Sequence, residues 1–297
     1  GDRPMKQGDL VVRKSYGGDI LFRISALAGD QAILRGTEYR LLADAPLKDL
    51  EPVKEGEQPE GVRKARIQSI ESVRRMVDAR RRLAGSRPWT AAEDRSFFEV
   101  PGKVLHLDGD PYYLRRSLTI YGQLGVPAEG YWAHETRMAE ALAALLPRVR
   151  PDIIVITGHD GFLKGSVDHR HLGNYKNSAN FVRAVTVVRQ YDRNRDGLVV
   201  IAGACQSHFE ALIGAGANFA SSPGRVMIHA LDPVYVAVRA ALTPFRESID
   251  MLDVISRTVS GARGIGGVET LGRFRVGTPN PAYTPHQVAP PPQIGPS

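Results

Sequence analysis

Two runs of aliphatic, largely β-branched residues constrain the fold of this chain more than any other feature. They are Ile153-Ile-Val-Ile-Thr-Gly-His159 and Leu198-Val-Val-Ile-Ala-Gly-Ala-Cys205. Such runs are typical of parallel strands that are buried on both faces. Open α/β sheets carry their reactive groups at the carboxyl ends of the strands. We therefore expect His159 and Cys205 to meet at one edge of a sheet.

A thiol and an imidazole at one sheet edge form a candidate nucleophile and general base. A histidine that precedes a cysteine by about 50 residues, with alanine just before the cysteine, is the arrangement typical of caspases. The pattern therefore predicts a cysteine peptidase with Cys205 and His159 as catalytic residues. The alternative for a lone cysteine is a small, buried apolar side chain. His208, three residues after Cys205, is a rival base, although we expect its side chain to lie along a helix.

The same edge is expected to hold an oxyanion site. We predict that Cys205 directly precedes a helix, whose amide groups lower the pKa of the thiol and bind negative charge. The backbone amides of Asp160, Gly161 and Cys205 are the candidate donors.

Acidic residues near strand ends are candidates for substrate binding. Asp108 and Asp110 follow an expected strand at 103–108, where a carboxylate can form a bidentate pair with a guanidinium group. The alternative is turn chemistry, because Asp-Gly and Asp-Pro are ordinary turn formers. Asp232 makes a similar candidate, and Ser221 and Ser222 lie in a loop that is expected to form a wall of the pocket.

Strand and helix patterns alternate from residue 101 onward. Strands are expected at 103–108, 128–133, 153–157 and 198–202, and helices at 113–124, 138–146, 177–191, 206–214 and 247–259. Such alternation predicts an α/β domain, a mostly parallel sheet flanked by helices, over residues 101–277. Residues 1–53 instead show short strands separated by turn residues, which predicts a small SH3-like β-barrel.

The segment between these two units is basic. Residues 63–87 account for the net charge of +7, and Ile67, Ile70, Val73 and Val77 recur at helical spacing. We interpret 54–100 as a linker with an amphipathic helix, either a solvated connector or a surface for an acidic partner. Nucleic acid is not an expected partner. The proline-rich residues 278–297 predict an extended or disordered tail.

Composition restricts the environment in which the chain works. No apolar run approaches the roughly 20 residues of a membrane span, and the first residues show no apolar signal core. The single cysteine fits a reducing, cytoplasmic compartment. Without a second cysteine or a His-Glu-x-x-His pattern, we expect neither a metal nor an organic cofactor.

Several stretches resemble the YabG family of sporulation-specific cysteine peptidases. They are residues 8–15, 101–110, 151–160, 202–213, 216–223, 228–235 and 264–270, the fourth of which reads Ala-Gly-Ala-Cys-Gln-Ser-His-Phe-Glu-Ala-Leu-Ile. The resemblance implies a caspase-like layout in which His159 and Cys205 form the dyad. It also implies cleavage after arginine and processing of spore coat and cortex-related proteins, in the mother cell of a sporulating bacterium or at the forming spore coat. Asp160 departs from the wider caspase-like pattern, which has glycine after the histidine.

Three further hypotheses remain open at this point. A preference for arginine would make residues 63–87 a substrate-like stretch at which the enzyme cuts itself. Alternatively, the chain is a non-catalytic spore assembly protein that binds a partner through the barrel and the arginine-rich helix, or an amidase acting on small molecules. The oligomeric state does not follow from the sequence.

Overall fold

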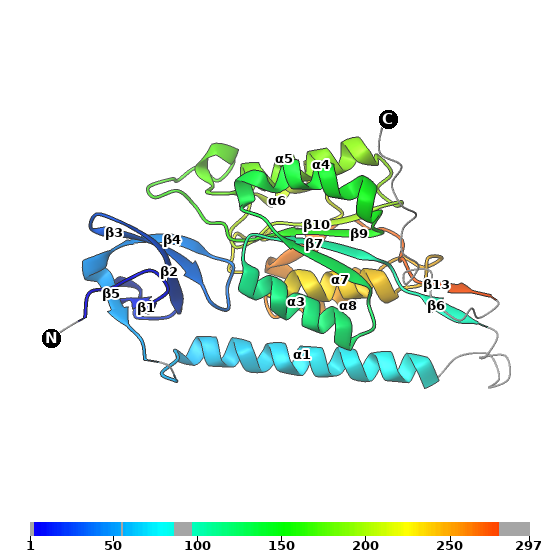
Figure 1. The fold of residues 1–297 in the computed structure, drawn as a ribbon, viewed down its shortest axis with the longest axis horizontal. Helices are drawn as coiled ribbons and strands as arrows, with labels where there is room; N and C mark the ends of the chain where they lie inside the picture. Colours follow the sequence, from blue (N-terminus) through cyan, green and yellow to red (C-terminus); the bar gives the residue numbers. More distant parts are fainter. Residues whose placement is uncertain (1–2, 55, 86–96, 279–297) are drawn as a thin grey trace, which may run out of the picture.

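The computed structural model describes residues 3–54, 56–85 and 97–278. An antiparallel sheet at the N-terminal end lies beside a larger sheet that is covered by helices on both faces, and a long helix runs along the molecule beneath both (Figure 1). The predicted α/β class with a mostly parallel sheet is confirmed.

The larger sheet has the strand order β12-β11-β10-β9-β7-β8. Its parallel strands are β7 (Val104–Asp108), β8 (Ala128–Trp132), β9 (Ile153–Thr157), β10 (Val199–Ala202) and β11 (Phe219–Ser221), and β12 (Ile265–Gly267) is antiparallel to β11. Every residue of β7, β9 and β10 is buried. Continuous aliphatic runs suit this position, because both faces of these strands contact helices.

Helices cover the two faces of this sheet (Figure 1). One face carries α4 (Met138–Val149), α5 (Ser178–Tyr191) and α6 (Phe209–Ala215), and the other carries α3 (Pro111–Gln123), α7 (Asp232–Leu242) and α8 (Met251–Arg257). Each face has its own apolar core. Sequence reasoning missed α7, and the helix expected at 247–259 is shorter.

The N-terminal unit is an antiparallel sheet of order β4-β3-β2-β1-β5. Its strands are β1 (Leu10–Arg13), β2 (Phe22–Ala28), β3 (Gln31–Gly36), β4 (Leu42–Pro46) and β5 (Leu50–Pro52). Its core includes Phe22, Ile24 and Leu34 and extends to Cys205 and Ile228 of the larger unit. The two units therefore share one apolar cluster, while the SH3-like barrel stays a prediction.

Short elements complete the fold. The strands β6 (Phe98–Val100) and β13 (Arg275–Gly277) pair with each other. Single 3-10 turns are η1 (Lys14–Tyr16), η2 (Leu47–Asp49), η3 (Glu135–Arg137), η4 (Leu172–Asn174) and η5 (Gly261–Arg263). The predicted tail lies outside the described residues apart from Thr278, as does the linker segment 86–96.

The helix α1 (Glu60–Gly85) occupies most of the predicted linker. Its buried side chains are Val62, Ala65, Ser69, Ser72 and Met76. Ser69 contacts the hydroxyl of Tyr235 at 2.8 Å, so this face packs on α7. Of the four apolar residues at helical spacing, Val73 and Val77 pack against the core, whereas Ile67 and Ile70 are 50% and 56% exposed.

The two cores give a direct test of packing. Leu142 on α4 is fully buried, whereas Leu252 on α8 is 79% exposed. We expect Leu142→Ala to lower the free energy of unfolding by about 2–5 kcal/mol, because it removes apolar contacts and leaves a cavity. Leu252→Ala should change it by less than about 0.5 kcal/mol. Urea denaturation of both variants measures the difference, and equal effects would contradict this packing.

Candidate active site

The carboxyl ends of three adjacent strands bring the predicted chemistry together. Asp108 ends β7, His159 follows β9 and Cys205 follows β10. These strands are parallel and neighbours, with Asp108 opposite Thr157 and Ala202 opposite Ile156. A hydrogen bond of 2.8 Å from the Thr157 hydroxyl to the Gly203 carbonyl connects the two loops that follow β9 and β10.

His159 is fully buried and held from three sides. Its Nε2 lies 2.7 Å from the Oδ2 atom of Asp110, its ring stacks on Tyr113, and its backbone amide donates to Glu135 at 3.1 Å. Burial raises the pKa of Asp110, but the hydrogen bond and charge of His159 outweigh it, and the net pKa is lowered. Because the Asp110 carboxylate binds Nε2, Nδ1 is the nitrogen of the His159 ring that is left for proton transfer.

Cys205 is also fully buried. Its Sγ accepts a hydrogen bond of 3.0 Å from the Ile228 amide and lies 3.4 Å from the carbonyl oxygen of Ile228. Burial raises the pKa of the thiol strongly. The expectation of a helix directly after Cys205 was wrong, because α6 begins only at Phe209.

A segment of the N-terminal sheet lies over these two residues. It comprises residues 37–41, which connect β3 to β4, and we call it the connecting segment. The carbonyl oxygen of Arg40 accepts hydrogen bonds from the amides of Cys205 at 3.2 Å and Asp160 at 3.1 Å. The Gly161 amide, also a predicted donor, instead bonds to the Asp160 carboxylate at 2.8 Å. Nδ1 of His159 lies 3.3 Å from the next carbonyl oxygen, that of Leu41.

The side chain of Arg40 fills a closed acidic pocket. Its guanidinium group donates two hydrogen bonds of 2.9 Å to the two oxygens of Asp108. Further bonds go to the carbonyls of Gly158 at 3.2 Å and Ala230 at 2.9 Å, and the guanidinium lies over the ring of Tyr113. Burial raises the pKa of Asp108, but the charge of Arg40 and a hydrogen bond from His106 outweigh it and lower the pKa to about 2.

The backbone of the connecting segment pairs with the protein on both sides of Arg40. The Arg40 amide donates to Ile228 at 3.0 Å, and the Ala230 amide donates to Glu38 at 2.8 Å. This forms an antiparallel bridge between Tyr39 and His229. Beyond Arg40, the Leu42 amide donates to the Asp160 carbonyl at 2.8 Å. Extended pairing of this kind is how peptides add to a sheet edge.

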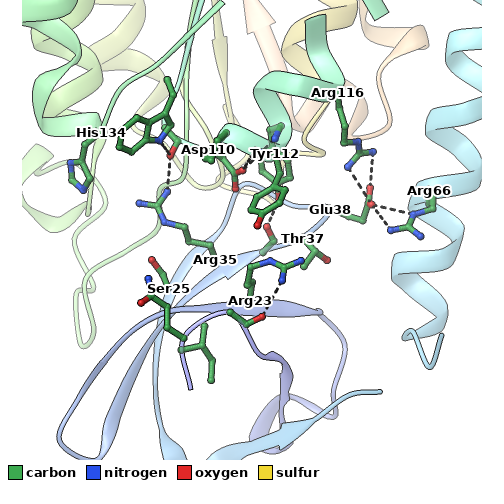
Figure 2. Close-up of a pocket in the computed structure, with 18 residues that line it drawn as sticks. Arg23, Ser25, Arg35, Thr37, Glu38, Arg66, Asp110, Tyr112, Arg116 and His134 are labelled. Atoms are coloured by element: carbon green, nitrogen blue, oxygen red, sulfur yellow. Dashed lines mark hydrogen bonds and ion pairs between the residues drawn. The ribbon is translucent and has the colours of Figure 1, made fainter. Parts of the chain in front are cut away.

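Glu38 anchors the start of this segment, and sequence reasoning missed it. Its buried carboxylate accepts hydrogen bonds from Arg66 of α1, from Arg116 of α3 and from His229 at 2.9 Å. Figure 2 shows the two arginines converging on it beside a cavity of about 580 Å³. Burial raises the pKa of Glu38, but these partners outweigh it and lower the pKa to about 2.

The remaining predicted site residues do not hydrogen-bond to Arg40 in the described part of the chain. Asp232 accepts from the amides of Val259 and Ser260, so it holds the loop after α8. The Ser222 hydroxyl donates to the Val226 carbonyl, and the buried Ser221 hydroxyl has no hydrogen-bond partner among the described residues. His208 caps α6 by accepting from the Ala211 amide. These side chains stabilise loops around the site.

Among the described residues, no helix is both long and apolar enough to span a membrane. No group of histidine, cysteine and acidic side chains in them has an arrangement suited to a metal ion.

The sequence matches the family described as YabG peptidase U57 over residues 6–279. This chain belongs to the YabG peptidase family. It is 44% identical over 283 residues to the sporulation-specific protease YabG of Bacillus subtilis strain 168, covering 92% of this chain and 97% of that protein. The resemblance to the family is thereby confirmed, and with it a peptidase function.

A likeness to a solved structure adds nothing on the fold. The RcsB response regulator of Salmonella typhimurium, solved in a study of its interaction with DNA, is 15% identical over 40% of this chain and 50% of that chain. Its TM-score is 0.24, a value too low to indicate a common fold.

The Arg40–Asp108 pair gives a prediction on stability. Asp108→Asn leaves the guanidinium group buried without a counter-charge, so we expect the free energy of unfolding to fall by about 3–5 kcal/mol. Glu140→Gln, which breaks the exposed pair with Arg137, should cost less than about 1 kcal/mol. Urea denaturation at neutral pH measures both. Equal losses in the free energy of unfolding would show that the buried pair stabilises the protein no more than the exposed pair does.

The same pair predicts an acid response. The pKa of Asp108 is lowered from 3.8 to about 2, so its contribution to stability is complete above about pH 4 and is lost as the pH falls through the folded-state value. The free energy of unfolding of the wild type should therefore fall more steeply between these two values than that of Asp108→Asn. If the free energies of unfolding of the wild type and Asp108→Asn fell equally with pH over this range, the assignment of the ion pair would be contradicted.

Proposed function

We propose that this protein is a cysteine endopeptidase that cleaves peptide bonds after arginine. One observation carries the proposal: a backbone carbonyl lies between the amides of Cys205 and Asp160 while the arginine that bears it is paired with Asp108. Two converging amides next to a thiol are the arrangement that stabilises the oxyanion in acyl transfer.

Each residue then has a role in the reaction. The Cys205 sulfur attacks the carbonyl carbon, and Nδ1 of His159 takes the thiol proton and delivers it to the leaving nitrogen. Asp110 holds Nε2 of His159 at 2.7 Å and stabilises the imidazolium, as the third group of a triad does. Water then hydrolyses the thioester and regenerates the thiol.

The pocket around Arg40 explains the preference for arginine. Asp108 binds the two ends of the guanidinium group, and the carbonyls of Gly158 and Ala230 accept further N–H groups. A lysine ammonium group is a point charge that does not match this fork. A neutral side chain would leave the buried carboxylate without a partner, which is the type of mismatch that sites reject most strongly.

The substrates we propose are spore coat and cortex-related proteins, processed during sporulation. The relative from Bacillus subtilis is named as a sporulation-specific protease, and its 44% identity supports a role in the same process for this chain. We place this activity in the cytoplasm of the mother cell and at the forming spore coat. The SH3-like barrel and the caspase-like layout of the larger unit are parts of the same proposal.

The proposed roles predict distinct losses of activity. On a peptide with a single arginine, Cys205→Ala should abolish cleavage, because it removes the nucleophile. Asp110→Asn should lower kcat on the order of 10²–10⁴-fold, because the imidazole loses its anionic partner. Glu140→Gln, on the exposed face of α4, should cleave as the wild type does. Mass spectrometry of the products measures all three.

Replacing arginine by citrulline in that peptide tests the pocket, because citrulline keeps the shape and loses the charge. We expect the arginyl peptide to be cleaved and its citrulline analogue to resist cleavage. Cleavage by the Cys205→Ala variant, or equal cleavage of the arginyl peptide and its citrulline analogue, would overturn the proposed function. Binding of an acidic partner without any cleavage would favour the assembly protein.

A further inference from the structure

The candidate active site is closed by a part of its own chain. Cys205, His159 and Arg40 each have 0% of their surface exposed, and Leu41 is 4% exposed. A protein substrate has no route to the thiol while the connecting segment stays in place.

The connecting segment makes the contacts that the proposed mechanism requires a substrate to make. The Arg40 side chain occupies the acidic pocket, and its carbonyl faces the two amides of the oxyanion site. The Arg40 amide donates to Ile228, and Glu38 and Leu42 on either side of it pair with the backbone of Ala230 and Asp160. A loop that only filled space would need none of these features together.

The peptide bond after Arg40 is the one whose carbonyl oxygen accepts from the amides of Cys205 and Asp160. Nδ1 of His159 lies 3.3 Å from the carbonyl oxygen of Leu41, on the leaving-group side of that bond. The arginines of 63–87, the stretch considered above for self-cleavage, lie largely in the regular helix α1. A helix would have to unwind to pair as an extended strand, since its backbone hydrogen bonds are already made.

We propose that the Arg40–Leu41 bond is a self-processing site, at which the enzyme cuts its own chain and thereby opens its active site to other proteins. This inference rests on the proposed peptidase function. The Cys205 sulfur forms a thioester with the Arg40 carbonyl carbon, the carbon–nitrogen bond to Leu41 breaks, and the Leu41 nitrogen takes the proton from His159. Water then converts the thioester to the Arg40 carboxylate and restores the thiol.

The anchoring of the segment explains why the uncut enzyme is closed. Glu38 is held by Arg66, Arg116 and His229, and the hydroxyl of Tyr113 donates to the carbonyls of Gly36 and Tyr39. A tethered segment competes with an outside substrate at an effective concentration in the millimolar range. Cutting after Arg40 leaves the pairing of β3 with β4 in place but frees the new ends at Arg40 and Leu41.

The first experiment follows freshly purified full-length protein by intact-mass spectrometry. We expect two fragments, residues 1–40 and 41–297, to appear with a first-order rate that dilution does not change, because the reaction is intramolecular. Cys205→Ala should stay intact. Cys205 is the only cysteine, so its alkylation by iodoacetamide reports access to the site and should rise as the fragments appear.

Variants of Arg40 separate the cut from the fold. Arg40→Gln removes the charge that Asp108 binds and should abolish the cut at this position. Arg40→Lys keeps a positive charge beside Asp108, and the protein therefore keeps its fold. Cleavage after this residue should be at least about tenfold slower, because lysine cannot form the bidentate fork. Arg63→Gln, an exposed position on α1, is the matched control and should be cut as the wild type is.

A peptide containing one arginine, assayed on the same samples, distinguishes the two proposals. If the protein cleaves the peptide while its own Arg40–Leu41 bond stays uncut, the self-processing site is overturned and the peptidase function stands. The same holds if the chain is cut first within 63–87. Absence of both peptide cleavage and self-cleavage would overturn the two together. Fragments at Arg40, slowed in Arg40→Lys and followed by faster peptide cleavage, would establish the site.

Discussion

The buried ion pair between Arg40 and Asp108 determines how the two units of this protein fit together. Both side chains have no exposed surface, and removing two charges from water is costly unless hydrogen bonds satisfy them. The carbonyls of Gly158 and Ala230 supply those bonds. Because the fork is bidentate, it fixes the guanidinium in position and orientation, and therefore fixes the carbonyl of Arg40 against the amides of the site.

Tyr113 connects this pair to the rest of the site. Its ring stacks on His159 and lies beneath the guanidinium group of Arg40, and its hydroxyl donates to the carbonyls of Gly36 and Tyr39. Asp110, which precedes it by three residues, caps α3 and binds His159. One helix N-terminus thus positions the imidazole, the pocket and the connecting segment, so these three features depend on the same first turn of α3.

Much of this site could be predicted from the sequence because it follows from the topology of parallel sheets. Asp108 ends one strand, and His159 and Cys205 follow the two strands next to it. Aliphatic runs in the sequence reveal such strands. Arg40 gave no signal, because its partner Asp108 is 68 residues away and nothing local marks a residue that crosses between units. The helix α7 was missed because Asp232-Pro233, at its first two positions, resembles a turn. The helical spacing of Ile67 and Ile70 predicted the helix α1 but did not show which of its apolar residues pack against the core.

The burial of the single cysteine also affects how readily its sulfur is oxidised. Burial raises the pKa of the Cys205 thiol and so disfavours the thiolate, which is the form that attacks peroxides and disulfides. The connecting segment that closes the site therefore also shields the Cys205 sulfur, which has no exposed surface, from oxidants in the solvent.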